Sequence, residues 1–307
     1  MSFSLVGKLA AVAVSASLLL AGCAAATPEP TTSPSASSSG DIAVDSAAAA
    51  LLPADFKDGV DVASDIPYAP MEFFLEDNKT VTGFDYDLGQ AIGAKLGVPF
   101  TFSDQDWDGI IPSLQAKKHD VIMSGMNDTT ERQKVLDFVD YFKAGFAVVV
   151  PKGNPEGIAA LADLCGKTVA IQTATAQIDL VNAVNPNCEK AGKPVIEVLE
   201  FPTDGDAQNA IRAGKASAGV NDGQVAAYTA QVAGDGEYFE IVNPNDPPAG
   251  FESALTGVGV LKANTGLRDA IQAAIQSLIA DGTYGKLLEK WNLSSFAVTE
   301  ATINGTK

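Results

Sequence analysis

Residues 83–97 read Gly-Phe-Asp-Tyr-Asp-Leu-Gly-Gln-Ala-Ile-Gly-Ala-Lys-Leu-Gly. Asp85 stands where the cap of a helix is expected, and Gly97 stands where a helix would end. Between them the apolar residues recur at the three- and four-residue spacing of a helix with one buried face: Leu88, Ala91, Ile92 and Leu96. The stretch therefore predicts one amphipathic helix.

The rest of the chain alternates short apolar runs with helical patterns from Phe56 onward. Ile110, Ile111 and Leu114 repeat the helical spacing, and Pro112 is expected in the first turn of that helix, where proline is tolerated. A strand is expected at 121–123. A second set of elements follows: strand 168–171, a helix from near Thr175, a further segment at 207–213, strand 217–220 and a helix from near Gly223. The last expected elements are strand 254–261 and helices 267–280 and 284–291. This alternation indicates an α/β fold with a mostly parallel sheet, arranged as two α/β lobes.

The first residues carry the pattern of a secretory signal. Lys8 precedes an apolar run at 9–20 that is too short to cross a bilayer as a helix. The run ends in Leu20-Ala21-Gly22-Cys23, which resembles the lipobox of bacterial lipoproteins. We expect residues 1–22 to be removed as a signal peptide and Cys23 to be lipidated, which would anchor the protein to the outer face of the cell membrane.

The segment after Cys23 differs in composition from the rest of the chain. Residues 24–40 consist of Ala, Thr, Pro, Ser and Gly with one charge, Glu29. Such a segment cannot bury enough apolar surface to offset the entropy of ordering it. We expect residues 23–44 to form a flexible tether between the anchor and the folded part.

Two further cysteines, Cys165 and Cys188, would be exported into a compartment where disulfides persist. We expect them to pair, and the alternative is two free buried thiols. His119 is the only histidine and lies far from both in sequence, so no metal site is expected. No cofactor is expected either. The sequence offers little for an enzyme, because no phosphate-binding loop, nucleophile elbow or metal-spaced set of histidines occurs.

The formal net charge of −18 and the isoelectric point near 4.3 bear on the partners of the protein. Affinity for nucleic acid comes largely from neutralising phosphates with lysine and arginine. Nucleic acid is therefore not expected as a partner.

Motifs spread along the chain resemble those of a known family. In order they are DIPYAP (65–70), GFDYDL (83–88), DWDGIIPSL (106–114), SGMNDTTER (124–132), GKTV with QTAT (166–169 and 172–175), NDGQVAAY (221–228), and DGTYG with Lys290 and Trp291. Together they resemble the family 3 solute-binding proteins, the polar amino-acid-binding proteins of ABC transporters. The resemblance covers nearly the whole domain after the tether.

The resemblance implies a type II periplasmic-binding-protein-like fold, in which two Rossmann-like lobes are joined by two crossover strands. One lobe would comprise residues 45–146 plus 250–307, and the other residues 147–249. The ligand would lie in the cleft between the lobes.

The resemblance also implies which residues meet the ligand carboxylate. Arg132 is the expected donor because a planar guanidinium can meet both carboxylate oxygens. Backbone donors near Gly125 would assist, and Asn127 stands where the family has a hydroxyl. Thr175 stands at a predicted helix start, which favours an anion, and Ala174 replaces the family glycine before it.

The other groups of an amino acid have expected partners too. Asp222 corresponds to the acidic group for the ammonium, and Tyr68 and Trp107 correspond to aromatic residues around the ligand side chain. Asp65 matches an acidic position that faces the side chain in cation-binding members, which favours arginine, lysine, ornithine or histidine. Further expected contacts are Ser124, Gln172 and Ala176.

Each residue also has a structural alternative. Arg132 could pair with a neighbouring carboxylate on a surface helix, Trp107 could be a core residue, and Asp65 could cap a turn. Tyr284 and Trp291 are expected to be structural, and Asp85 and Asp87 to cap and orient the helix at 83–97.

The expected function is the extracytoplasmic binding subunit of an ABC importer, a monomer that works with permease and ATPase subunits and is not an enzyme. Two alternatives stay open on the sequence. A few proteins of this fold act as extracytoplasmic dehydratases of the cyclohexadienyl type, and others report a ligand to a membrane receptor.

Overall fold

The computed structural model describes residues 42–242 and 250–307. The expected signal peptide, Cys23 and residues 24–41 of the expected tether lie outside the described residues. Ile42 falls within the expected tether, yet it is partly buried against the main hydrophobic core. The folded part of the chain therefore includes residue 42.

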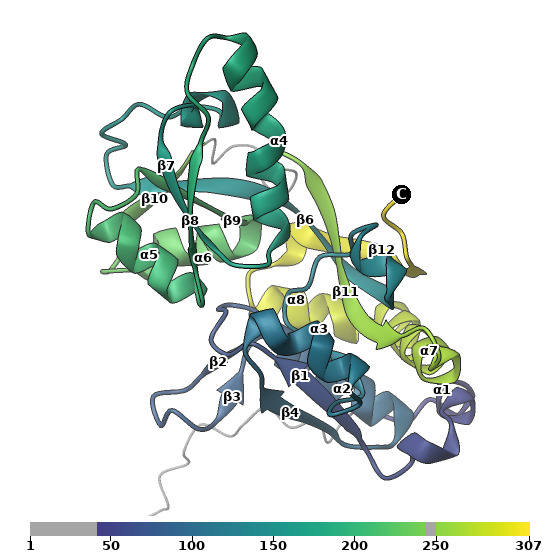
Figure 1. Ribbon diagram of the computed structural model, residues 1–307. Coiled ribbons are helices and arrows are strands. Elements are labelled where there is room, and N and C mark those ends of the chain that lie inside the picture. Colours follow the sequence, from purple (N-terminus) through teal and green to yellow (C-terminus); the bar gives the residue numbers. More distant parts are fainter. Residues whose placement is uncertain (1–41, 243–249) are drawn as a thin grey trace, which may run out of the picture. The chain divides into compact units, whose positions relative to one another are not determined.

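One group of strands and helices, which we call lobe 1, is built on a parallel core of three strands (Figure 1). Strand β1 (Val60–Ser64) pairs in parallel with β4 (Phe100–Asp104) on one side and with β5 (Val121–Ile122) on the other. Strand β11 (Ser253–Leu261) continues the sheet antiparallel to β5. A separate hairpin joins β2 (Phe73–Phe74) and β3 (Val81–Thr82).

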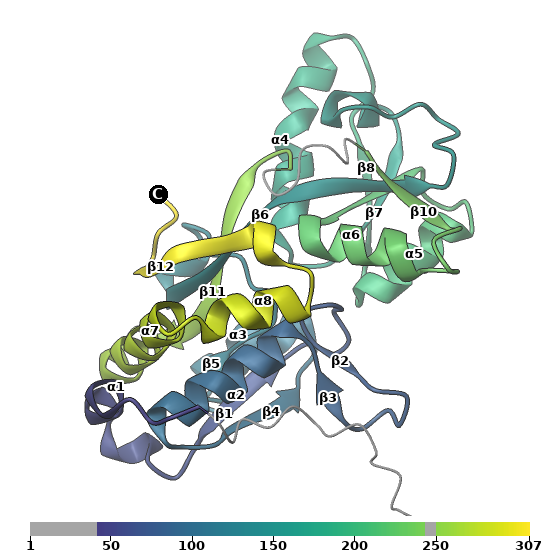
Figure 2. The same cartoon turned by 180° about the vertical axis from the view of Figure 1, so that it is seen from behind.

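Helices cover both faces of the lobe 1 sheet (Figure 2). Helix α3 (Trp107–Gln115) packs through Ile110 and Leu114 on one face, against Ile122 and Phe138. The larger core lies on the other face, under α1 (Ser46–Leu51), α2 (Phe84–Leu96), α7 (Thr265–Ala280) and α8 (Thr283–Lys290).

The second group, lobe 2, repeats the design with a smaller sheet. Strand β7 (Thr168–Gln172) pairs in parallel with β8 (Glu197–Phe201) and β9 (Ala218–Asp222). Helix α4 (Ala176–Lys190) closes one hydrophobic core, while α5 (Asp204–Arg212) and α6 (Gly223–Val232) close another. Short 3-10 helices lie at Ala54–Phe56, Arg132–Lys134, Leu161–Leu164 and Ser294–Phe296.

A single long strand belongs to both lobes. Strand β6 (Leu136–Pro151) pairs with β11 through Gly145, and from Phe146 onward it pairs with β9 and with β10 (Phe239–Val242). Near its start it also pairs with β12 (Ala297–Ile303). The change of partner between Gly145 and Phe146 marks where the chain passes from one sheet region to the other.

Two local predictions about the helices are wrong. Gly83, not Asp85, precedes α2. Its φ of 129° is one that glycine adopts readily, and any other side chain would clash there, because a Cβ would lie 2.2 Å from the carbonyl oxygen of Met71. Asp85 is fully buried and accepts hydrogen bonds from outside its own helix. Pro112 lies in the second turn of α3 rather than the first.

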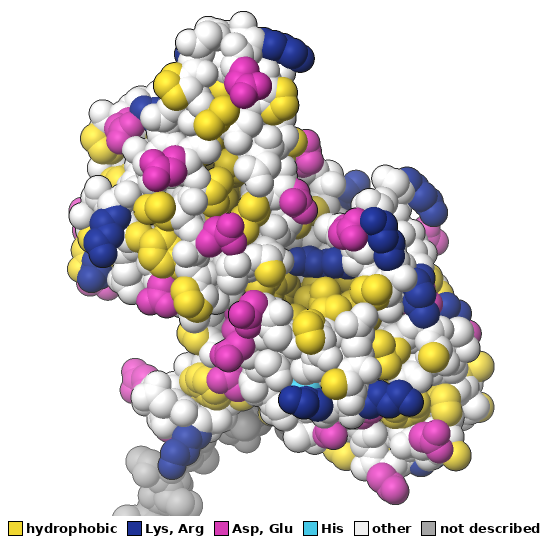
Figure 3. Space-filling view, in the orientation of Figure 1, with side chains coloured by type: hydrophobic (Ala, Val, Ile, Leu, Met, Phe, Trp, Pro, Cys, Tyr) yellow, Lys and Arg dark blue, Asp and Glu magenta, His cyan; other side chains and the backbone are white. Residues whose placement is uncertain are grey.

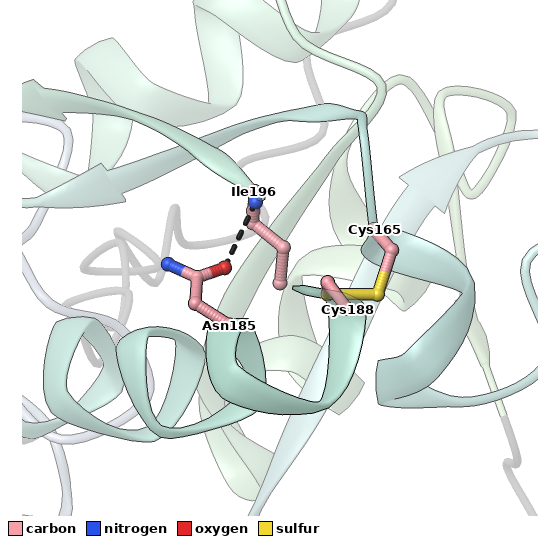
Figure 4. The surroundings of a disulfide bond; sticks show 4 residues. All are labelled: Cys165, Asn185, Cys188 and Ile196. Carbon is pink, nitrogen blue, oxygen red and sulfur yellow. Dashed lines mark hydrogen bonds between the residues drawn. A yellow bond between two sulfur atoms is a disulfide. The ribbon is translucent and has the colours of Figure 1, made fainter. Parts of the chain in front are cut away.

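The predicted disulfide between Cys165 and Cys188 is present (Figure 4). It ties α4 to the segment that follows the 3-10 helix Leu161–Leu164. Near it, Asn185 of α4 accepts a hydrogen bond of 2.8 Å from the backbone N–H of Ile196, just before β8. The C-terminal half of α4 is thus fixed to lobe 2 at two places.

Removing this disulfide is expected to destabilise the protein. Cys165 and Cys188 are separated by 23 positions, and closing a loop of that size stabilises the folded state by about 3 kcal/mol through restriction of the unfolded chain. The double variant Cys165→Ser, Cys188→Ser should lose about that free energy of unfolding in urea. Dithiothreitol should lower the stability of the wild type and leave the double variant unchanged, and an equal effect on both proteins would contradict the prediction.

The described residues form no helix that is both long and apolar enough to span a membrane. Acidic side chains are scattered over both lobes on the face shown in Figure 3. The excess of Asp and Glu over Lys and Arg is therefore distributed, not confined to one segment.

Candidate functional site

A small cavity with a volume of about 10 Å³ lies where strand ends and helix starts of the two lobes meet. Most of the residues that the sequence predicted to bind ligand line it: Asp65, Tyr68, Trp107, Ser124, Gly125, Asn127, Gln172, Thr175 and Asp222. Arg132 and Ala176 instead line an adjoining pocket that shares Thr175 with the cavity. One lining residue, Gln177, was not predicted.

The loop after β5 is fixed by hydrogen bonds to buried acidic side chains. The Ser124 hydroxyl donates to Glu72 Oε1 at 2.6 Å and accepts from the backbone N–H of Asp65 at 2.9 Å. The Gly125 N–H donates to Asp85 Oδ2 at 2.7 Å, and the hydroxyl of Tyr141 donates to Asp85 Oδ1. Burial raises the pKa of Asp85 to about 7.

These bonds alter one expectation about the loop. Backbone donors near Gly125 were expected to meet the ligand, but the N–H of Gly125 itself is bonded to Asp85. Gly125 has a φ of 56°, and a Cβ there would lie 3.0 Å from the ring of Tyr68. Glycine at this position therefore lets the Tyr68 ring lie against the loop at the cavity wall.

Asp222 occupies the lobe 2 side of the cavity, at the end of β9. It is 2% exposed, and it accepts hydrogen bonds from the Tyr68 hydroxyl at 2.7 Å and from Asn127 Nδ2 at 3.1 Å. Burial raises the pKa of this carboxyl above its ordinary value. Asn127, expected beside a ligand carboxylate, thus directs its amide to the acid.

Arg132 reaches from the start of the 3-10 helix Arg132–Lys134 toward lobe 2. Its Nη1 donates to the carbonyl of Asn127 at 2.9 Å and its Nη2 donates to the carbonyl of Ala174 at 3.2 Å. The guanidinium carbon lies 5.2 Å from the centre of the Trp107 ring. Burial lowers the pKa of Arg132 to about 10, while the charge of Asp222 opposes that change, so the guanidinium stays charged at neutral pH.

Ala174 connects the lobes through its carbonyl oxygen, which also accepts a hydrogen bond of 3.2 Å from Trp107 Nε1. Its φ of 56° is in the left-handed region that favours glycine. The replacement of the family glycine by Ala174 therefore keeps the loop conformation that a glycine would adopt easily.

A second carboxylate, Asp65, enters the cavity from the end of β1. Its Oδ2 accepts a hydrogen bond of 2.7 Å from Gln172 Nε2 of lobe 2. Burial raises the pKa of Asp65 to about 6, with Asp104 and Asp106 adding to the effect and Gln172 opposing it. The cavity thus contains one carboxylate from each lobe.

The start of α4 supplies the remaining wall. Thr175 is the N-cap residue, and its hydroxyl donates to the carbonyl of Gln172 at 2.7 Å and makes no cap bond. Gln177 follows two positions later and is 4% exposed. A glutamine in the first turn of a helix gives no local sign of a binding role, which is why the sequence did not reveal it.

The remaining titratable candidates lie elsewhere. His119 is half-buried in the turn between α3 and β5 and does not line the cavity. Within residues 42–242 and 250–307, His, Cys, Asp and Glu side chains form no group of three or more that could hold a metal ion.

A sequence profile of the bacterial extracellular solute-binding proteins, family 3, matches residues 60–294. The chain belongs to this family. The match covers the strands and helices that carry every cavity-lining residue. The protein is therefore a solute-binding protein that acts outside the cytoplasm, and the resemblance drawn from the sequence motifs is confirmed.

A relative of this family 3 chain is the arginine-binding protein ArgT of Corynebacterium glutamicum. The two are 32% identical over 243 residues, which cover 78% of this chain and 75% of the relative. The similarity extends over most of both chains and is not restricted to one lobe.

Solved structures of similar amino-acid-binding proteins confirm the predicted two-lobed α/β fold. An ancestral arginine-binding protein bound to arginine is 37% identical, with a TM-score of 0.67 and coverage of 77% of this chain and 99% of that one. The ancestral amino acid-binding protein AncCDT-1, a precursor of cyclohexadienyl dehydratase, is 33% identical, with a TM-score of 0.66 and coverage of 76% and 94%.

Proposed function

We propose that this solute-binding protein opens its lobes to admit a free basic amino acid, with L-arginine the first candidate, and binds it between them, where the small cavity lies. The observation that carries the proposal is the pair of carboxylates, Asp65 and Asp222, which lie on opposite lobes of one small cavity beside Arg132 and Trp107. A basic amino acid has two cationic groups and one carboxylate. Each of these groups then has a partner of opposite charge.

The two carboxylates take different roles in this proposal. Asp222 receives the α-ammonium together with the polar groups that already surround it, Tyr68 and Asn127. Asp65 receives the side-chain cation, and the rings of Tyr68 and Trp107 lie along the aliphatic stem. Similarity to an arginine-binding relative and to an arginine-bound ancestral structure supports arginine as the first candidate.

Arg132 takes the ligand carboxylate. Its Nη2 now donates to the carbonyl of Ala174, and a carboxylate is a stronger acceptor than a neutral carbonyl. Ser124, Gly125, Thr175 and Ala176 complete the surroundings of the ligand. Because Arg132 belongs to lobe 1 and Asp222 to lobe 2, one ligand that bonds to both stabilises the closed arrangement.

The proposal extends to the organisation of the chain. Lobe 1 comprises residues 45–146 and 250–307 and lobe 2 comprises residues 147–249, with β6 and β11 as the crossover strands. The protein acts as a monomer, is held at the membrane by a lipid on Cys23 beyond the tether, and delivers its ligand to the permease and ATPase subunits of an ABC importer. It does not transform the ligand.

Isothermal titration of the ligand-free mature domain tests the proposal. The panel contains L-arginine, L-lysine, L-ornithine, L-histidine, L-glutamine and L-glutamate, and ligand carried over from expression is removed by unfolding, dialysis and refolding. We expect saturable one-to-one binding of basic amino acids. Binding of L-glutamate or L-glutamine alone would remove the role of Asp65, and no binding across the panel would contradict the proposal.

A second candidate function, a dehydratase of the cyclohexadienyl type, is favoured only by similarity to AncCDT-1. Incubation of the protein with prephenate and with arogenate separates the two functions. A binding protein returns both compounds unchanged, whereas a dehydratase converts them to aromatic products that absorb in the ultraviolet.

The affinity for L-arginine is expected to depend on pH through Asp65. Burial raises the pKa of Asp65 to about 6, so its charge is lost as the pH falls through that value. A cation bonds to the ionised form, and at pH 5 about one tenth of Asp65 is ionised, so the affinity should fall about tenfold between pH 7.5 and pH 5. The affinity of the Asp65→Asn variant should change less over the same range, and an identical slope in both proteins would exclude Asp65.

A further inference from the structure

Gln177 is the second residue of α4 and lines the same cavity as Asp222. Its side-chain oxygen, Oε1, is buried and has no hydrogen-bond partner. Native proteins rarely leave a buried carbonyl oxygen without a donor, because water is lost and nothing replaces it. The atom therefore indicates a donor that belongs to the ligand.

Other buried polar atoms without a partner do not share this position. Glu72 Oε2, Asp140 Oδ1, Thr256 Oγ1 and both polar atoms of Gln224 are also unpaired, but none of these residues lines the cavity. Of the unpaired buried atoms in the described part of the chain, only Gln177 Oε1 belongs to a cavity-lining residue.

The surroundings of Gln177 identify the kind of donor. Burial raises the pKa of Asp222, and hydrogen bonds from side chains that include Gln177 lower it, so the Gln177 amide lies beside the Asp222 carboxylate. With the amide nitrogen of Gln177 toward Asp222, the amide oxygen is an additional acceptor in the part of the cavity beside Asp222. An acceptor next to a carboxylate suits a cationic donor with several N–H groups.

We propose that Gln177 Oε1 accepts a hydrogen bond from the α-ammonium of the bound amino acid, beside Asp222. This assignment rests on the proposed function. An ammonium has three N–H donors, and Asp222 already accepts hydrogen bonds from Tyr68, Asn127 and Gln177, so a further acceptor completes the site. A neutral amide supplies this acceptor without adding a second negative charge. A second carboxylate beside Asp222 would raise the pKa of one of the two carboxyl groups.

Two substitutions at Gln177 test the proposal. Gln177→Met keeps the length and removes the acceptor, whereas Gln177→Glu keeps an acceptor and removes the donor. Gln224→Met is a matched control, because Gln224 is also the second residue of its helix, is 1% exposed and is unpaired, but lies outside the cavity. The Kd values for L-arginine, L-lysine and L-histidine are measured at pH 7.5 for the wild type and all three variants.

We expect Gln177→Met to raise the Kd about 10- to 100-fold, since a hydrogen bond to a charged group is lost. Gln177→Glu and Gln224→Met should stay within about threefold of the wild type or bind more tightly. The loss in Gln177→Met should be the same for every amino acid that the wild type binds, because the α-ammonium is common to all. If the wild type binds one amino acid alone, the analogue of that amino acid without its α-amino group is used in place of the panel. The Kd of this analogue should be the same for Gln177→Met as for the wild type.

Other outcomes overturn the assignment. Equal losses in Gln177→Met and Gln177→Glu would mean that the amide N–H beside Asp222 matters and that Oε1 is not an acceptor for the ligand. A loss confined to one amino acid, or one that the deaminated analogue shares, would place the contact on the ligand side chain. Unchanged binding in Gln177→Met would mean that Gln177 has no role in binding, while the proposed function would stand. A wild type that binds no amino acid would contradict both the role of Gln177 and the proposed function.

Discussion

The substitution Arg132→Met is expected to raise the Kd for L-arginine by about 30- to 4000-fold. The guanidinium lines the pocket that adjoins the cavity, and a bidentate bond to a carboxylate combines two charge-assisted hydrogen bonds. Truncating one partner of a buried charge pair weakens binding by about 2–5 kcal/mol, and 1.4 kcal/mol corresponds to a tenfold change. Isothermal titration with L-arginine measures the effect.

Lys134→Met is the matched control for this experiment. Lys134 lies in the same 3-10 helix, but its side chain is 66% exposed and pairs with Glu131 at the surface. Its removal should leave the Kd within about twofold, since exposed ion pairs contribute little. Arg132→Lys should bind weakly as well, because an ammonium cannot meet two oxygens in one plane. Full affinity in Arg132→Met would exclude Arg132 as the carboxylate donor.

Asp222→Asn is expected to weaken binding by a similar factor. The substitution keeps the size of the side chain and removes the charge that would meet the α-ammonium, inside a cavity where water offers little compensation. It also places an amide hydrogen opposite the hydroxyl of Tyr68 or the amide of Asn127, both of which now donate to Asp222. The Kd of every basic amino acid should therefore rise about 100- to 1000-fold.

Asp204→Asn provides the comparison for Asp222. Asp204 is likewise buried in lobe 2, and burial raises its pKa to about 6, but its side-chain partners are Gln208 and Asn221 and it does not line the cavity. This variant should bind normally. If both aspartate variants lose affinity equally, the effect of Asp222→Asn arises from damage to lobe 2 and not from the loss of a ligand contact.

The fold could be predicted well where local chemistry and tertiary structure agree. Gly97 ends α2 in the left-handed conformation expected of a helix stop, and Thr175 precedes α4 as expected. The role of Asp85 could not be predicted, because an aspartate near a helix start looks the same whether it bonds to its own helix or to Gly125 forty positions away. The sixteen-residue strand β6 pairs with four other strands, and which strands these are depends on the whole sheet.

The candidate site shows the same division. The family motifs pointed to Asp65, Trp107 and Asp222, and the structure brings these residues to one cavity. The sequence could not show that Asn127 turns its amide toward Asp222, since that bond depends on how lobe 1 meets lobe 2. Gln177 escaped notice for the same reason, because its importance comes from an unpaired oxygen that exists only in the folded protein.

The hydrogen bond from Trp107 Nε1 to the carbonyl of Ala174 has a practical consequence. The chain has two tryptophans, and the second, Trp291, donates to Asp87 within lobe 1 and lies against Phe73. Opening of the lobes would break the Trp107 bond, and it would also change the pocket that Trp291 lines together with Tyr228 and Gln231 of lobe 2. Trp107 is thus a built-in optical probe: with Trp291 replaced by Phe, its fluorescence emission would follow each opening and closing without any attached dye.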